Sequence, residues 1–127
     1  MVGRSRDGIC GGRRCDGLIA RFWSAHTTRA LAPAYAEHLR SHVLPKLHAL
    51  DGYTSAMLLE REGQTDIEPI VVTFWQSLDA IRAFSGPDLE TAVVEDAAVA
   101  VLSEFDRRVR HYEIILQDGR QQQVAPS

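Results

Sequence analysis

The stretch "IEPIVVTFWQSLDAIRAF", residues 67–84, joins a strand pattern directly to a helix pattern. Residues 67–75 are rich in Ile, Val, Phe and Trp, the residue types that favour β-strands. Ser77 is a typical helix N-cap, and Leu78, Ile81 and Phe84 follow it at helical spacing. The sequence therefore predicts a strand over 67–75 that turns at once into a helix.

The flanking segments alternate between the same two patterns. They predict a strand over 18–23, a helix from Thr27 or Thr28 to residue 50, a strand over 53–61 and a turn over 62–66. Pro45 is expected to kink or end the first helix. After residue 84 we expect a break at "SGPD" (85–88), a resumed helix to about residue 107 and a last strand over 109–116. The order β-α-β-β-α-β predicts an α+β, ferredoxin-like fold with an antiparallel sheet.

Both faces of the predicted third strand are apolar. Ile70, Val72 and Phe74 would lie on one face, with Val71, Thr73 and Trp75 on the other. A sheet that is apolar on both faces must be covered on both, but the two helices of this order cover only one. We therefore expect a homodimer in which the uncovered sheet faces meet.

The length of 127 residues fits one domain. Residues 1–17 are rich in Gly and Arg and predict a flexible leader, residues 18–116 the ferredoxin-like domain, and residues 117–127 a polar tail. Cys10 and Cys15 lack further ligands at metal-binding spacing, so no metal site is expected. The leader has no apolar stretch of the kind a secretory signal needs, which makes the cytoplasm the expected location.

Charge and hydropathy exclude two classes of partner. Residues 1–17 hold 4 of the 14 basic and 2 of the 17 acidic groups, so residues 18–127 hold 10 basic and 15 acidic groups. Nucleic-acid binding needs clustered Lys and Arg, and a membrane span needs about 18 to 20 consecutive apolar residues. We expect neither kind of partner.

Two stretches resemble the antibiotic biosynthesis monooxygenase family of the dimeric α/β-barrel proteins. They are "VTFWQSLDAIRAFSGPDLETAVV" (72–94) and "FDRRVRHYEIIL" (105–116), with a Trp-x-Ser turn, a helix ending in Phe-x-Gly and a His-Tyr-Glu strand. The resemblance covers about residues 18–116. It implies a dimeric barrel and activities that include cofactor-independent oxidation of aromatic polyketides and haem degradation. The chain contains no Asn, which counts against the haem-degrading site, and we expect no cofactor.

The strand order that this fold implies, 4-1-3-2, predicts where a site would lie. The start of strand four would face the end of strand one, which places His111 near Phe22 and Trp23. Tyr35 and His38 would lean over the same patch from the first helix. The expected cavity holds Arg21, Trp23, Tyr35, His38 and His111, with Phe84 as a possible apolar wall, while Trp75 belongs at the opposite end.

Each candidate side chain has a catalytic and a structural interpretation. His111 is the candidate general base, since histidine titrates near neutral pH, but it could equally be a hydrogen-bonded histidine on a covered face. Tyr35 or Arg21 would stabilise a substrate oxyanion, although Tyr35 also fits a core position. His38 and His42 have i, i+4 spacing without a third metal ligand, which is typical of a solvated helix flank.

The sequence leaves three functions open. In the first, a cofactor-independent monooxygenase binds an aromatic, polyketide-like substrate in an apolar pocket that contains Arg21, Trp23, His38 and Phe84, with His111 and Tyr35 catalytic. The second is a polyketide cyclase-like enzyme that transfers protons without oxygen. The third is a dimeric ligand-binding or stress-associated module without turnover, since a fold does not determine a function.

Overall fold

The computed structural model describes residues 18–119 and, from the preceding segment, residues 9–10 and 13–14. Strands β2 (Ile9–Cys10) and β3 (Arg13–Arg14) pair with each other. The rest of the expected leader, and residues 120–127 of the tail, lie outside the described residues. Within the described part, no helix is both long enough and apolar enough to cross a membrane.

The sheet is antiparallel and has β4 (Ile19–His26) next to its centre. β6 (Ile67–Trp75) pairs with one edge of β4 and with β5 (Tyr53–Glu62) on its own far side. The other edge of β4 pairs with β7 (Glu104–Phe105) and β8 (Arg110–Glu113). The predicted strand order is therefore confirmed, and Arg21 lies directly opposite His111 in the register of β4 and β8.

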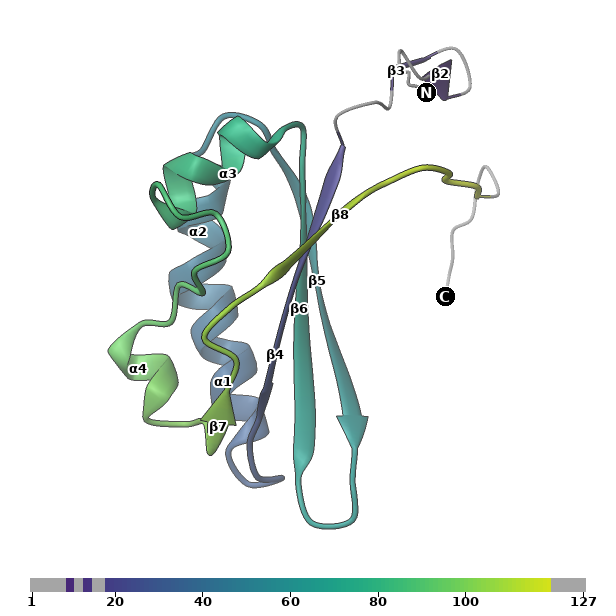
Figure 1. Cartoon of the computed structure of the whole chain (residues 1–127). Coiled ribbons are helices and arrows are strands. Elements are labelled where there is room, and N and C mark those ends of the chain that lie inside the picture. The colour runs from purple at the N-terminus through teal and green to yellow at the C-terminus, as the bar shows by residue number, and fades with distance from the viewer. Residues whose placement is uncertain (1–8, 11–12, 15–17, 120–127) are drawn as a thin grey trace.

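The helices of the described residues all lie on one side of this sheet, and none of them covers the other side, called here the bare face (Figure 1). The first helical segment runs as α1 (Ala32–His38), the π-helical turn η1 (Leu39–Val43) and α2 (Leu44–His48). Thr28 precedes it, and its hydroxyl accepts a hydrogen bond from the backbone N–H of Leu31 over 3.1 Å.

Pro45 was expected to kink or end the helix. It does not end the helix, because the helical backbone continues to His48. Proline has no N–H to donate, and its ring crowds the preceding turn. A wide π-helical turn stands immediately before it. Such turns change the hydrogen-bond spacing from four residues to five, which gives the ring room.

The second helix is shorter than predicted. α3 (Leu78–Ser85) begins at Ser77, whose side chain accepts from the N–H of Ala80, and it ends at Gly86 with a φ of 87°. The expected resumption to about residue 107 is wrong: only one helical turn, α4 (Asp96–Val99), is present. Instead, Ala92 donates to the carbonyl of Arg107, and Val109 donates to the carbonyl of Glu90. Residues 90–92 thus pair with residues 107–109, just before β8, and these backbone hydrogen bonds replace those of a helix.

The core lies at the end of the sheet where β6 finishes. It consists of Ile19, Leu47, Trp75 and Ile81, which are at most 8% exposed. The Trp75 ring contacts Tyr53 and Phe84 at centroid distances of 5.5 and 6.0 Å. This cluster fixes α2 and α3 on the sheet and leaves the middle of the layer for a cavity.

The bare face carries apolar side chains. Phe22 and Tyr112 form an edge-to-face pair there, with centroids 5.3 Å apart. Met57 and Leu59 follow on β5, 47% and 44% exposed. Scattered apolar side chains on a surface are normal, whereas large contiguous apolar patches are typical of interaction surfaces.

Candidate active-site cavity

A cavity of about 60 Å³ lies between the helices and the sheet. Its lining is mostly apolar, with four ionisable side chains. The lining residues are Arg21, Trp23, Tyr35, His38, Leu39, Val43, Leu47, Val71, Thr73, Phe84, Val93, Val94, Glu95, Ala98 and Val109. Ligand sites usually measure about 300–1,000 Å³, so a ring-sized ligand requires one wall to move outward. One wall of the cavity is formed by Val93, Val94, Glu95 and Ala98, which lie on a loop and a single helical turn.

Arg21 is a buried cation that has no carboxylate partner among the described residues. It is 4% exposed, and its guanidinium donates to the backbone carbonyls of Leu89 and Thr91 over 2.7 and 2.9 Å. It also lies over the Phe84 ring, 5.6 Å from the centroid. Burial lowers the pKa of Arg21 to about 10, so it remains charged at neutral pH. An arginine has five N–H donors, and a buried charge is usually paired. An anion in the cavity would supply the missing partner.

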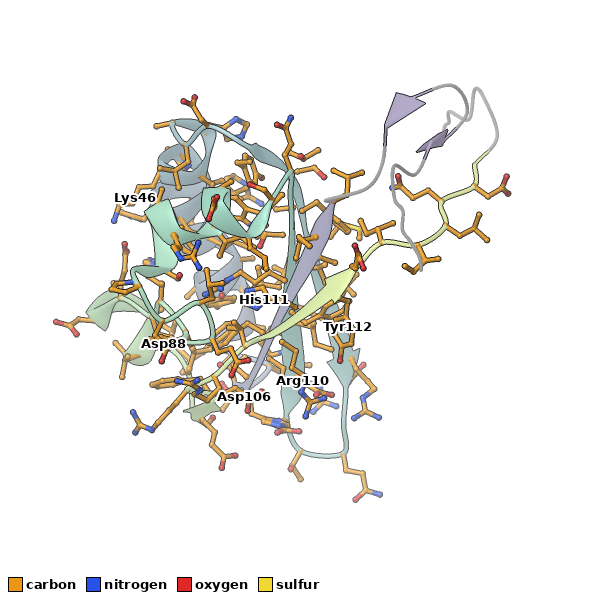
Figure 2. All side chains as sticks on the ribbon, turned by 45° about the horizontal axis from the view of Figure 1, so that its top comes forward. Lys46, Asp88, Asp106, Arg110, His111 and Tyr112 are labelled. Atoms are coloured by element: carbon orange, nitrogen blue, oxygen red, sulfur yellow. The ribbon has the colours of Figure 1, made fainter. Side chains whose placement is uncertain are left out.

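His111 lies beside Arg21 on the same face of the sheet, but it is not among the residues that line this cavity. Its Nε2 is 2.9 Å from the Arg21 NH1 nitrogen. Arginine can only donate, so Nε2 accepts and the ring proton is on Nδ1. Desolvation and then the Arg21 charge lower the pKa of His111, while Glu90 opposes them. His111 is therefore a neutral histidine that orients Arg21. Figure 2 shows it on β8 next to Tyr112, which belongs to the bare face.

Tyr35 and Trp23 form the aromatic part of the lining. Their rings lie 6.1 Å apart, and the Trp23 indole N–H donates to the carbonyl of Asp106 over 2.7 Å. Burial raises the pKa of the Tyr35 phenol far above its ordinary value. Tyr35 therefore keeps its proton at all physiological pH values and can act as a hydrogen-bond donor.

His38 and Glu95 form the polar end of the lining. The His38 Nε2 is 3.6 Å from Glu95 Oε1, beyond hydrogen-bonding distance, and Glu95 pairs with Lys46 on α2. The hydrogen bond from Lys46 lowers the pKa of Glu95, so this carboxylate is ionised. Within the described residues, no group of three His, Cys, Asp or Glu side chains is arranged to hold a metal ion.

The structure brings together five of the six residues predicted for the site: Arg21, Trp23, Tyr35, His38 and Phe84. The expectation that His111 shares their cavity is wrong, because Arg21 stands between them and His111 lines a separate open hollow with Glu90 and Arg110. Trp75 is absent from the lining, as expected. The sequence reasoning missed Glu95, since the pattern around it predicted a continuous helix and gave no indication that it would reach His38.

His111 should make stability depend on pH. Because its pKa is lower in the folded than in the unfolded state, the unfolded chain binds the proton first, and stability is lost as the pH falls below about 6.5. We expect His111→Gln, whose side-chain oxygen can still accept from Arg21, to flatten the fall in unfolding free energy over this range. Urea denaturation at several pH values measures the unfolding free energy of the wild type and the variant. His48→Gln, which changes an exposed histidine, is the control. If the unfolding free energy of His111→Gln depended on pH as in the wild type, the tautomer derived above would be contradicted.

No family model matches the chain, and no curated protein matches it either. Solved structures do match the chain. One is a Bacillus cereus protein assigned provisionally to the antibiotic biosynthesis monooxygenases, with a TM-score of 0.59 and 11% identity over 82% of this chain and 99% of that one. Another is SnoaB, a cofactor-independent oxygenase from Streptomyces nogalater, with a TM-score of 0.52 and 19% identity over 78% and 95%. The chain therefore has the ferredoxin-like fold of the antibiotic biosynthesis monooxygenases.

Proposed function

We propose that the chain is a cofactor-independent oxygenase that acts on a small, weakly acidic aromatic molecule. The observation that carries this proposal is the buried Arg21 cation. It has no carboxylate partner in the part of the chain that the structure describes, and it lines an aromatic and apolar cavity. Such a cation stabilises the anion of a phenol or anthrone far better than water-exposed charges do. The likeness in fold to an oxygenase that needs no cofactor supports the same chemistry.

The reaction proceeds from the substrate anion. Loss of a proton leaves an electron-rich ring, held by Arg21 and by the Tyr35 hydroxyl, with Trp23 and Phe84 as the apolar walls. The anion donates electrons to O₂, and an anthrone methylene carbon then forms a hydroperoxide. Elimination of water leaves one oxygen atom on carbon as a carbonyl and the other in the water released. The protein contributes binding, desolvation and proton transfer.

Oxygen uptake tests the proposal. Purified protein should consume O₂ with at least one member of a panel of hydroquinones and anthrones, faster than buffer or heat-denatured protein. One-ring members come first, since the cavity is small. Absence of uptake above these blanks across the panel would overturn the oxygenase assignment.

A second candidate is proton transfer without oxygen, as in cyclisation of a polyketide chain. It is favoured by the presence of both Arg21 and the His38–Glu95 pair in one cavity, since these groups suffice to move a proton. Product formation that continues under nitrogen would support it over the oxygenase. Ligand binding without either reaction would indicate the non-catalytic module.

The bare sheet face is proposed to bind a second copy of the chain. Phe22, Met57, Leu59 and Tyr112 provide its apolar surface, and a stable interface of this kind buries at least about 1,200–2,000 Å² in total. Light scattering at micromolar concentration should give twice the mass of one chain. The double variant Met57→Lys with Leu59→Lys should give a monomer, while Leu78→Lys on the helical side should stay dimeric. A monomeric wild type would refute this arrangement.

A further inference from the structure

His38 has a buried ring nitrogen without a partner. Its side chain is 7% exposed, and Nε2 makes no hydrogen bond within the described part of the chain. A buried polar atom left unpaired is destabilising, so proteins keep few of them. The ring lines the same cavity as Arg21. An apolar side chain at this position would avoid the unpaired nitrogen, so the presence of His38 there indicates a function.

The group nearest to this nitrogen is a fixed carboxylate. Glu95 Oε1 lies 3.6 Å from Nε2, and the other carboxylate oxygen of Glu95 is bound by Lys46. The remaining ionisable neighbours are on the same helical segment: His42, which stacks on His38 with centroids 5.3 Å apart, and Tyr35 at 6.3 Å. The Arg21 cation lines the cavity from β4. Among these groups, Glu95 is the one that attracts a proton on His38.

A second ring proton completes the arrangement. Whichever nitrogen carries the proton of the neutral ring, uptake of another gives an imidazolium whose Nε2–H faces Glu95. A charge-assisted hydrogen bond then replaces an unpaired atom. His111 offers no comparable site, because its lone pair is already bound to Arg21.

We propose that His38 is the proton acceptor of this cavity and that Glu95, held by Lys46, is its positioning residue. The inference rests on the proposed function, in that the ligand is a phenol or enol whose anion pairs with Arg21. The ligand O–H bond breaks, its electron pair stays on oxygen, and the proton binds the imidazole. The cavity gains no net charge, which lowers the cost of ionising a buried ligand.

The test counts protons on binding of 4-nitrophenol. Below neutral pH this phenol is mostly neutral in water, whereas its anion absorbs visible light. Calorimetry in two buffers of different ionisation enthalpy gives the number of protons released to the buffer when 4-nitrophenol binds as its coloured anion. We expect close to zero for the wild type, because His38 keeps the proton, and about one for His38→Gln. His42→Gln, which removes the stacked but exposed neighbour, should behave as the wild type.

Turnover provides a second readout if a substrate is found. His38→Gln should lower kcat by about 10²- to 10⁴-fold, the usual contribution of a general base. Glu95→Gln should retain part of the activity and move the acidic limb of the pH–rate profile to lower pH, because an amide does not stabilise an imidazolium. Melting curves check that both variants are folded.

The outcomes separate the two proposals. Equal proton release by the wild type and His38→Gln would overturn the role of His38 and leave the oxygenase proposal standing. Proton retention by the wild type without oxygen uptake on any substrate would support His38 and overturn the oxygenase. Failure of the wild type to bind 4-nitrophenol would remove the anion site and overturn both.

Discussion

Replacement of Arg21 by Gln should weaken the binding of 4-nitrophenolate by about 30-fold or more. Removing one partner of a buried charge pair costs about 2–5 kcal/mol, and each 1.4 kcal/mol is a factor of ten in Kd. Arg21 is 4% exposed and has no competing carboxylate, so this cost falls almost wholly on the ligand. Titration by visible absorbance measures the Kd, because the free phenol is mostly neutral at mildly acidic pH and the bound anion therefore adds absorbance.

Two controls make the Arg21 result specific. Nitrobenzene, which has no acidic hydroxyl, should bind the wild type and Arg21→Gln with similar affinity, which tests whether the cavity is intact. Arg82→Gln removes an exposed arginine on α3 and should leave the Kd for 4-nitrophenolate unchanged. Equal phenolate affinity in Arg21→Gln and the wild type would refute the anion site.

Trp75→Ala should lower the free energy of unfolding by about 3–5 kcal/mol, the range for large aromatic residues in cores. Trp75 is fully buried among Ile19, Leu47 and Ile81, and its indole N–H donates to the Thr73 hydroxyl over 2.8 Å. Loss of the ring opens a cavity under α2 and α3 and leaves that hydroxyl without its donor. A small domain has only about 5–15 kcal/mol in total, so the variant should be close to unfolded. Urea denaturation followed by circular dichroism measures the change.

Conservative variants keep this prediction measurable if Trp75→Ala does not fold. Trp75→Phe should still cost more than the matched Trp23→Phe, because Trp23 is only half-buried and borders an existing cavity. The difference should be visible in the midpoint of the urea transition. Equal costs for the two tryptophans would mean that the core does not lie where β6 ends.

Much of the fold could be predicted because its signals are local. The alternating apolar residues of 67–75, the Ser77 cap and the turn over 62–66 depend on neighbours in the chain, and the structure has β6, α3 and the hairpin at those positions. The segment 86–107 could not be predicted in the same way. Its apolar residues fit a helix, but residues 90–92 form backbone hydrogen bonds with residues 107–109, just before the last strand. Hydrogen bonds to a distant segment leave no mark in the local pattern.

The sequence by itself determined the order of strands and helices, the two apolar faces of the sheet and the gathering of Arg21, Trp23, Tyr35, His38 and Phe84 on one side of it. Only the tertiary structure decided which histidine can accept a proton. The register of β4 on β8 places Arg21 opposite His111 and occupies the free nitrogen of that ring. The loop before α4 brings Glu95 to His38, 57 residues away in sequence. The reason is physical: side-chain types set what chemistry is possible, but the protonation of a histidine depends on what its two nitrogens touch, and those contacts come from distant parts of the chain.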